Sequence, residues 1–215
     1  MPVEVKICGL STPEMVDAAL AAGADYVGLV FYPRSPRNLT LDRAADLARR
    51  ARGRARVVAL VVDAEDGFLK EIAARVDPDL IQAHGGETPA RVAEIGRLTG
   101  KPVIKAIRVK DQADIAAAAG YCEAASLIMY DAKAPETLGN ALPGGNGHAF
   151  DWGLLEGEKR PAFMLAGGLN PANVAEAIRV TGAPIVDVSS GVETAPGVKD
   201  AGLIRKFIEA AKRPR

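Results

Sequence analysis

The chain has 215 residues, of which 48% are hydrophobic and 25% charged, the balance of an ordinary globular protein. Its 27 basic and 27 acidic side chains cancel, so no overall field draws the chain to nucleic acid or to an anionic membrane. Aromatic residues make up only 5% of the chain, which argues against a surface on which nucleic-acid bases stack.

Short β-rich runs and Ala-rich helical segments alternate along the chain, and most strands begin about 23 residues after the previous one. Glycine ends several of the helical segments, as in AAGADYVG and VTGAPIVD, where a left-handed residue caps the helix before the next strand. We expect strands at Val3–Cys8, Asp25–Phe31, Arg56–Val62, Asp79–His84, Pro102–Arg108, Ala125–Asp131, Pro161–Ala166 and Pro184–Ser189. We expect helices at Pro13–Ala22, Leu41–Arg52, Glu65–Val76, Pro89–Thr99, Asp111–Ala118, Pro171–Thr181 and Leu203–Lys212.

This alternation predicts an α/β fold with eight strands and about eight helices, a closed (β/α)8 TIM barrel that residues 1–215 form as a single domain. The alternative is an open doubly wound sheet, which would leave less apolar edge strands and place a glycine fingerprint after the first strand. Neither feature is evident. Loops that follow barrel strands face the active site, so the long gaps 31–56 and 131–161 are the expected substrate loops.

The sequence gives no sign of export or of a membrane span. No apolar stretch reaches the roughly 18–20 residues that cross a bilayer, and the N-terminus lacks the pattern of a signal peptide. Two cysteines, Cys8 and Cys122, are too few for a disulfide framework, so we expect a cytoplasmic protein. The basic run from Arg49 to Arg56 is interpreted as a solvated helix end.

Two reactive groups end expected strands. Cys8 ends the first strand, and Lys6 lies one layer below it on the same face, where an ammonium would lower the pKa of the thiol. Asp131 ends the sixth strand. Across a barrel mouth, a small substrate between the two groups would meet an acid and a base. The alternatives are an inert buried cysteine and an ordinary turn aspartate.

Further polar residues are expected around the same mouth. Arg37, in FYPRSPR, carries the planar fork that pairs with a carboxylate, and Arg34 is its rival. Gln82 and His84 share a face of the fourth strand and are expected to line the pocket, although a lone histidine is more often structural. Asp187, on the eighth strand, is expected there as well.

Lys105 stands in the middle of the fifth strand. A Schiff-base lysine at this place would mark an aldolase-like enzyme. We expect instead that Lys105 joins Glu4 and Lys6 in a polar layer inside the barrel.

Glycine-rich loops follow the last three strands. In barrels, the loops after the seventh and eighth strands commonly bind phosphate through bare backbone amides. The loops LAGGLNPANV and VDVSSGVE stand at these two places, and LPGGNG follows the sixth strand. The candidate phosphate-binding residues are therefore Gly144, Gly145, Gly167, Gly168, Ser190 and Gly191.

No metal or cofactor is expected. The two histidines, His84 and His148, have no metal-ligand spacing, and there is no Walker loop or dinucleotide fingerprint. Two other functions stay open: a sugar-phosphate epimerase, which would usually need metal-binding His and Asp residues, and a non-catalytic sugar-phosphate binding module on the same fold.

Taken together, the stretches KICGL, GLVFYPRSPR, IQAHG, VIKAIRV, YDAK, LPGGNG, FDW, LAGGLNPANV and VDVSSGVE resemble the phosphoribosylanthranilate isomerases of tryptophan biosynthesis. The resemblance runs from the first strand to the last. It implies a metal-free Amadori rearrangement of N-(5'-phosphoribosyl)anthranilate to 1-(o-carboxyphenylamino)-1-deoxyribulose 5-phosphate, by an intramolecular aldose–ketose isomerase.

The resemblance also implies roles for individual residues. Cys8 would be the general base, Asp131 the general acid and Arg37 the ligand of the anthranilate carboxylate, while the three glycine loops would hold the phosphate. The expected partner is a small phosphosugar, without nucleic acid or membrane, and the expected assembly is a monomer or a homodimer.

Overall fold

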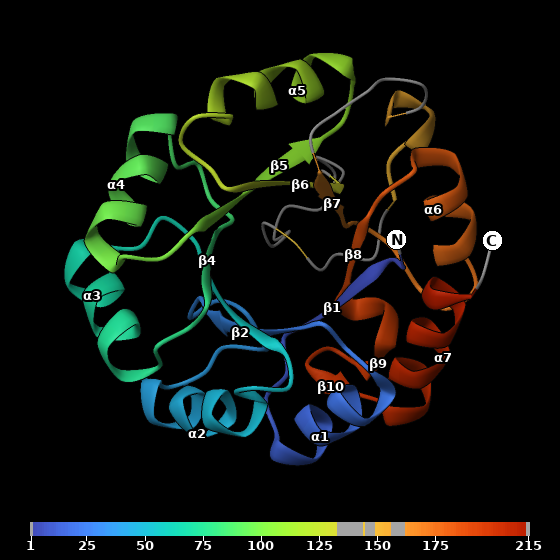
Figure 1. The fold of residues 1–215 in the computed structure, drawn as a ribbon, viewed down its shortest axis with the longest axis horizontal. Coiled ribbons are helices and arrows are strands. Elements are labelled where there is room, and N and C mark those ends of the chain that lie inside the picture. Colours follow the sequence, from blue (N-terminus) through green and yellow to red (C-terminus); the bar gives the residue numbers. More distant parts are fainter. Residues whose placement is uncertain (1, 133–143, 145–148, 156–161, 214–215) are drawn as a thin grey trace.

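The computed structural model describes residues 2–132, 144, 149–155 and 162–213. Eight parallel strands close into a barrel in chain order, because the first strand pairs with both the second and the eighth. This confirms the closed barrel and excludes the open sheet (Figure 1). The strands, each within two residues of its expected bounds, are β1 (Glu4–Cys8), β2 (Tyr26–Phe31), β3 (Arg56–Val61), β4 (Leu80–Ala83), β5 (Val103–Val109), β6 (Leu127–Ala132), β7 (Phe163–Leu165) and β8 (Ile185–Val188).

A ring of helices surrounds the barrel (Figure 1). Local chemistry sets their ends: the Thr12 hydroxyl accepts from the Met15 amide at the start of the first helix, and Gly23 closes that helix at a φ of 90°. The helices are α1 (Pro13–Ala22), α2 (Leu41–Ala51), α3 (Asp66–Arg75), α4 (Pro89–Thr99), α5 (Gln112–Ala117), α6 (Val174–Thr181) and α7 (Ala201–Lys212).

Two departures from the expected helices concern the segments around β7. Helix α6 begins three residues later than expected, because the side chains of Asn170 and Asn173 accept from the amides of Ala172 and Asn170 and hold a turn there. Between β6 and β7, the described residues contain the 3-10 helix η2 (Trp152–Leu155) and no α-helix. The described part of the chain therefore holds seven α-helices where about eight were expected.

Short elements also follow β5 and β8. The 3-10 helix η1 (Ala118–Tyr121) continues α5. The 3-10 helix η3 (Ser190–Val192) follows β8 and leads into an antiparallel hairpin of β9 (Glu193–Ala195) and β10 (Val198–Lys199), which was not expected. This hairpin lies on the outside of the barrel between α1 and α7 in Figure 1.

Alternation along the strands separates the inside of the barrel from its outside. Val5 and Ile7 belong to the large core between barrel and helices, so Lys6 and Cys8 face the barrel interior. A separate cluster fills the lower interior, contributed by Tyr26, Val58, Leu80, Ile104, Ala106, Met129, Met164, Ala166 and Ile185. The polar residues at the carboxyl ends of the strands lie above this apolar cluster. The barrel interior is therefore packed with side chains, as expected, and is not an open pore.

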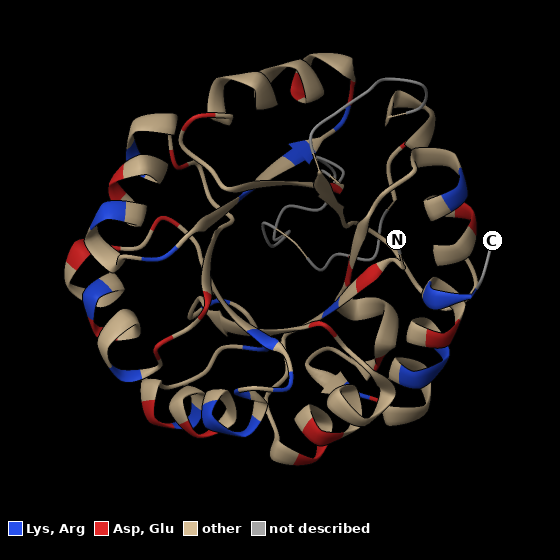
Figure 2. Cartoon of the chain, in the orientation of Figure 1, with Lys and Arg blue, Asp and Glu red and all other residues tan. Residues whose placement is uncertain are grey.

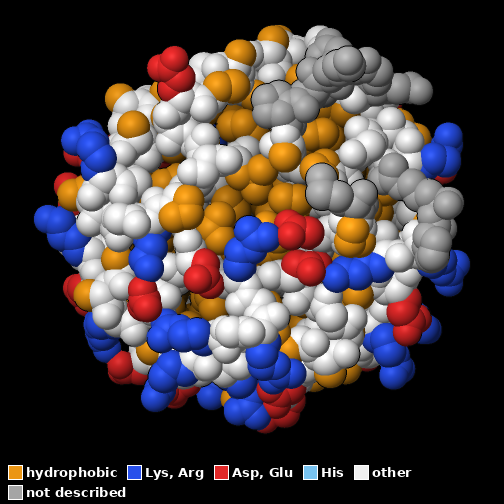
Figure 3. All heavy atoms as spheres, viewed as in Figure 1, with side chains coloured by type: hydrophobic (Ala, Val, Ile, Leu, Met, Phe, Trp, Pro, Cys, Tyr) orange, Lys and Arg blue, Asp and Glu red, His pale blue; other side chains and the backbone are white. Residues whose placement is uncertain are grey.

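Charged side chains stand mostly on the outer helices (Figure 2). The face in Figure 3 has hydrophobic side chains gathered near its middle and charged ones around them. The first part of the basic run is a solvated helix end as predicted, because Arg49 and Arg50 lie in the last turn of α2, whereas Arg56 begins β3. Exposed Arg50, Arg52 and Arg56 pair with the carboxylates of Asp17, Asp77 and Glu4. Among the described residues, no helix combines the length and the apolar character that a bilayer span requires.

The prediction that Lys105 lies in a polar layer inside the barrel is wrong. Its neighbours Ile104 and Ala106 fill the barrel interior, so Lys105 points outward, where its ammonium lies 2.7 Å from Glu87 and 2.8 Å from the Gly85 carbonyl. Glu4 and Lys6 do face the interior. Both side chains of the outer pair are buried, with exposed fractions of 3% for Lys105 and 1% for Glu87.

We expect Lys105→Met to lower the free energy of unfolding by about 3–5 kcal/mol, because the Glu87 carboxylate would stay buried without its cation. Urea denaturation measures this loss. The matched control is Lys70→Met, since Lys70 is exposed on α3 and its replacement should change stability by less than about 0.5 kcal/mol. Equal stability of the two variants would contradict the outward ion pair.

Candidate active site

The thiol of Cys8 lies at the carboxyl end of β1, inside the barrel mouth. Its residue is 4% exposed, and the adjacent strand supplies Gly28, where a Cβ would stand 2.9 Å from the Cys8 sulfur. One layer below, the Lys6 ammonium bonds Asp187 at 2.8 Å, and the Lys6 side chain is fully buried. The structure thus brings Cys8, Lys6 and Asp187 together as the sequence predicted.

Lys6 acts on the pKa of the thiol in the expected direction, but burial outweighs it. Burial raises the pKa of Cys8, and this outweighs the lowering by the ammonium of Lys6; Asp187 adds to the rise and Lys199 opposes it. The pKa of Lys6 is itself raised, since the attraction of Asp187 and Cys8 outweighs desolvation. The resting site therefore favours the neutral thiol beside a charged lysine.

Asp131 is the second-to-last residue of β6 and forms a buried chain with Gln82 of β4 and with His84, which follows β4. Its Oδ2 lies 2.9 Å from Nε2 of His84, and Nδ1 of His84 lies 2.7 Å from the amide nitrogen of Gln82. Gln82 is fully buried, and its Oε1 has no hydrogen-bond partner among the residues that the structure describes. If the Gln82 amide is flipped, its oxygen accepts from Nδ1–H of His84. The hydrogen bonds that join Gln82, His84 and Asp131 can therefore form with either tautomer of His84, and with the shared proton on His84 or on Asp131.

Gly144 covers this acid. A Cβ at Gly144 would lie 2.8 Å from both Asp131 Oδ2 and His84 Nε2, so the backbone approaches the pair closely. A phosphate contact of Gly144 stays a prediction. Gly145 and most of the long loop after β6 lie outside the described residues.

Arg37, rather than exposed Arg34, is held at the mouth. Its Nε and one terminal nitrogen donate to the two oxygens of Glu193, each at 2.7 Å, and the Arg37 residue is 5% exposed. The stem of Arg37 crosses Gly9, the residue after Cys8, where a Cβ would meet Arg37 Cδ at 2.5 Å. Gly9 has a φ of 77°, so both its conformation and its missing side chain are required.

Glu193 and Lys199 are site residues that the sequence reasoning missed. Lys199 Nζ lies 2.6 Å from Glu193 Oε1 and also donates to the Ser189 carbonyl at 3.0 Å. Glu193 ends the stretch VDVSSGVE, and its position just after the glycine loop was a usable signal. Lys199 gave none, because the hairpin that carries it has no clear pattern.

The two candidate phosphate loops contact one another. A Cβ at Gly191, in η3, would stand 1.9 Å from the Leu169 carbonyl in the loop after β7. In that loop, Gly167 and Gly168 have positive φ values of 88° and 63°. Gly167, Gly168, Ser190 and Gly191 therefore gather at one place, beside the carboxyl ends of β7 and β8.

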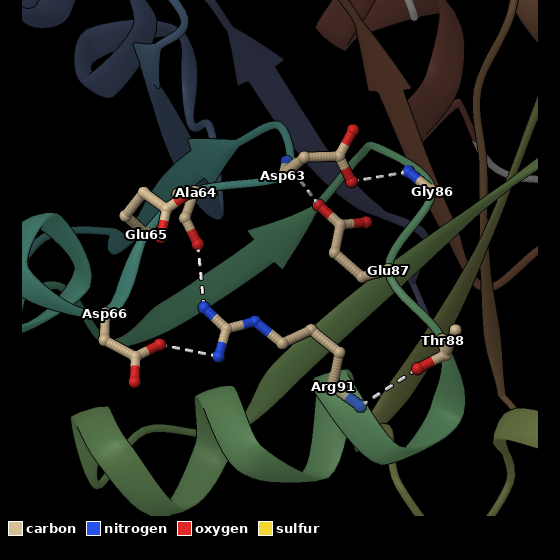
Figure 4. Close-up of a pocket in the computed structure, with 8 residues that line it drawn as sticks. All are labelled: Asp63, Ala64, Glu65, Asp66, Gly86, Glu87, Thr88 and Arg91. Atoms are coloured by element: carbon tan, nitrogen blue, oxygen red, sulfur yellow. Dashed lines mark hydrogen bonds and ion pairs between the residues drawn. The ribbon is translucent and has the colours of Figure 1, made fainter.

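A surface cavity of about 450 Å³ lies apart from these residues, between the loops after β3 and β4 (Figure 4). Its polar groups largely bind one another: Gly86 N–H donates to Asp63 at 2.8 Å, and Arg91 bonds the Ala64 carbonyl and Asp66. The Glu87 carboxylate beside it accepts from the Asp63 amide. The cavity thus lies where the two loops meet, and none of the candidate site residues from the sequence analysis lines it.

The described residues contain no cluster of three or more His, Cys, Asp or Glu side chains that could hold a metal ion. The paired groups of the mouth are instead an acid, a thiol and several cations. Such a set suits proton transfer on an anionic substrate.

Comparison with known proteins identifies the family of this chain. A family model described as N-(5'-phosphoribosyl)anthranilate (PRA) isomerase matches residues 5–210. The N-(5'-phosphoribosyl)anthranilate isomerase of Rhodopseudomonas palustris (strain BisA53) is 57% identical over 213 residues, which is 99% of this chain and 97% of that protein. The isomerase of Paramagnetospirillum magneticum is 54% identical and covers 100% of both chains.

Solved structures agree. A phosphoribosyl anthranilate isomerase in complex with reduced 1-(o-carboxyphenylamino)-1-deoxyribulose 5-phosphate superposes with a TM-score of 0.83, at 33% identity and 98% coverage of both chains. Monomers generated from the dimeric isomerase of Thermotoga maritima give a TM-score of 0.83, at 34% identity and the same coverage.

We expect Gly9→Ala to lower the free energy of unfolding by at least about 2 kcal/mol, because it adds backbone strain and a collision with the Arg37 stem. Two matched variants separate these causes. Gly23→Ala adds strain alone, since φ is 90° and the space is open, and Gly67→Ala adds neither. Urea denaturation should rank the losses in that order; a Gly9→Ala loss no larger than that of Gly23→Ala would contradict the packing of Arg37 over Gly9.

Proposed function

Because this chain belongs to the N-(5'-phosphoribosyl)anthranilate isomerase family of tryptophan biosynthesis, we propose that Cys8 and Asp131 are the base and the acid of its aldose–ketose isomerisation. The observation that carries this assignment is the geometry of the mouth. A buried thiol at the end of β1 and a buried carboxyl group at the end of β6 both face the barrel interior. Neither the packing of the core nor the closure of the barrel requires these two residue types at these positions.

The reaction needs two proton transfers on one sugar. Asp131 donates a proton to the ribose ring oxygen, and the ring opens to a Schiff base between C1 and the anthranilate nitrogen. Cys8, as thiolate, removes the proton from C2 and leaves an enolamine, which tautomerises to the 2-ketone. His84, bonded to Asp131, orients that carboxyl group and can share its proton.

The two anionic ends of the substrate provide orientation. We place the phosphate on the paired loops of Gly167–Gly168 and Ser190–Gly191, which contact each other at the carboxyl ends of β7 and β8. Arg37 receives the anthranilate carboxylate. Held at both ends, the sugar presents its ring oxygen and C2 to the two catalytic groups, and binding energy becomes rate acceleration.

The setting of the protein is part of the proposal. The substrate is a small phosphosugar, and no nucleic acid or membrane takes part. We propose a cytoplasmic enzyme that is a monomer or a homodimer, with the dimeric relative from Thermotoga maritima as the nearest support. Loss of anthranilate fluorescence from freshly made substrate tests the activity itself, and binding of substrate without turnover would identify a binding module instead.

We expect Cys8→Ser and Asp131→Asn each to lower kcat by about 10²–10⁴-fold, the usual contribution of a placed acid or base. The unfolding temperature should stay close to that of the unaltered protein, because both changes are nearly isosteric. Cys122→Ser is the control, since Cys122 is exposed and its loss should leave turnover unchanged. Full turnover in either active-site variant would remove that residue from the mechanism.

In Asp131→Asn, whose amide does not titrate, loss of the acid's proton cannot offset the gain of thiolate. We expect the residual kcat/KM of this variant to rise with pH from about pH 6 to about pH 9, because the pKa of Cys8 is raised above the usual cysteine value near 8.5. The sign follows from the reactive form: only the thiolate accepts a proton, and a raised pKa moves its appearance to higher pH. Lys6, Lys199 and Asp187 are the charged groups that act on this thiol. A pH profile of kcat/KM in Asp131→Asn that stays flat over this range would exclude the thiolate as the base.

A further inference from the structure

The substrate-facing arginine has a carboxylate already bound to it. Glu193 accepts two parallel bonds from Arg37, each 2.7 Å long, and the side chains are only 6% and 4% exposed. Such a bidentate pair fixes the guanidinium in one orientation. It also neutralises the charge of Arg37, so the pair alone would attract a substrate carboxylate poorly.

Lys199 restores the charge. Its ammonium lies 2.6 Å from Glu193 Oε1, and its side chain is 1% exposed. Two cations and one anion leave the group of Arg37, Glu193 and Lys199 with a formal charge of +1. We call these three residues the Arg37 cluster.

The hairpin of β9 and β10 supplies both supporting residues. Glu193 starts β9 and Lys199 ends β10, and the two are paired across the hairpin. A Cβ on Gly197, in its turn, would lie 2.9 Å from the Pro36 carbonyl, so the turn packs against the loop that carries Arg37. Lys199 further donates to the Ser189 carbonyl, and the Ser189 hydroxyl donates to the Cys8 carbonyl at 3.2 Å. The hairpin thereby ties the carboxylate-binding side of the mouth to the strand end that bears the thiol.

We propose that Glu193 and Lys199 are positioning residues for the substrate carboxylate: Glu193 sets the direction of the Arg37 guanidinium, and Lys199 keeps the Arg37 cluster cationic. This inference rests on the proposed role of Arg37. In this proposal, neither Glu193 nor Lys199 contacts the substrate. Removal of the Lys199 charge should weaken substrate binding, and removal of the opposing Glu193 charge as well should restore it.

The experiment measures KM and kcat with N-(5'-phosphoribosyl)anthranilate for Lys199→Gln and Lys199→Met. Glutamine keeps hydrogen-bonding capacity without charge, so it serves even where methionine impairs folding. We expect KM to rise about 10- to 100-fold and kcat to fall by a smaller factor, because Lys199 also favours the Cys8 thiolate. Lys206→Met, an exposed change on α7, is the control and should leave both unchanged.

The double variant Glu193→Gln/Lys199→Gln separates charge from bracing. Its cluster returns to +1, because Arg37 is then the remaining charge of the three, so KM should fall back to within about threefold of the unaltered enzyme. A purely structural brace would lose more from two changes than from one. A KM in the double variant above that of Lys199→Gln would therefore overturn the inference.

A substrate without the carboxylate, N-(5'-phosphoribosyl)aniline, locates the effect. Its KM should be the same with Lys199→Gln as with the unaltered enzyme, and an equal rise for both substrates would show that the charge acts on the phosphate and overturn the inference. The variant Arg37→Met distinguishes failure of this inference from failure of the proposed role of Arg37. A raised KM in Arg37→Met with an unchanged KM in Lys199→Gln would reject the inference alone, and an unchanged KM in Arg37→Met would reject the proposed role of Arg37.

Discussion

Charge buried at the mouth of a barrel has to be paired, and this requirement organises the structure. Taking an ion out of water costs several kcal/mol unless an opposite charge or hydrogen bonds compensate for it. Lys6 therefore lies against Asp187, and Arg37 and Lys199 share Glu193. Lys6 and Arg37 are each paired with a residue from a distant segment of the sequence, so the closed barrel and these two pairs depend on one another. The same pairs place charge where an anionic substrate would bind.

The thiol of Cys8 lies among these charged groups, and their pairing affects its pKa. Lys6 and Lys199 favour the thiolate, but Asp187 and burial oppose them, and the pKa is raised. Lys6 is already engaged by Asp187, so only part of its field acts on the sulfur. If Cys8 is the base, as proposed, a neutral resting thiol protects it from oxidants, because the thiolate is the form that oxidises.

A buried ion pair also lies outside the barrel, where it holds two loops together. Lys105 and Glu87 form a buried pair between the strands and α4, and the Glu87 carboxylate also accepts from the amides of Asp63 and Gly85. These bonds join the loops after β3 and β4 around the cavity of Figure 4. Ion pairs inside the mouth thus serve the site, while this outer pair serves the loops that frame it.

The sequence alone determined the order of strands and helices and the closed barrel, and it placed each strand to within two residues, because local periodicity, helix caps and glycine turns encode them. Alternation from Cys8 also placed Lys6 correctly. The tertiary structure decided the rest. Strand β5 is apolar on both faces, so its pattern did not show that Lys105 points outward. The partnership of Arg37 with Glu193, the raised pKa of Cys8 and the cover of Asp131 by Gly144 depend on closure and burial, which bring together residues that no local pattern connects.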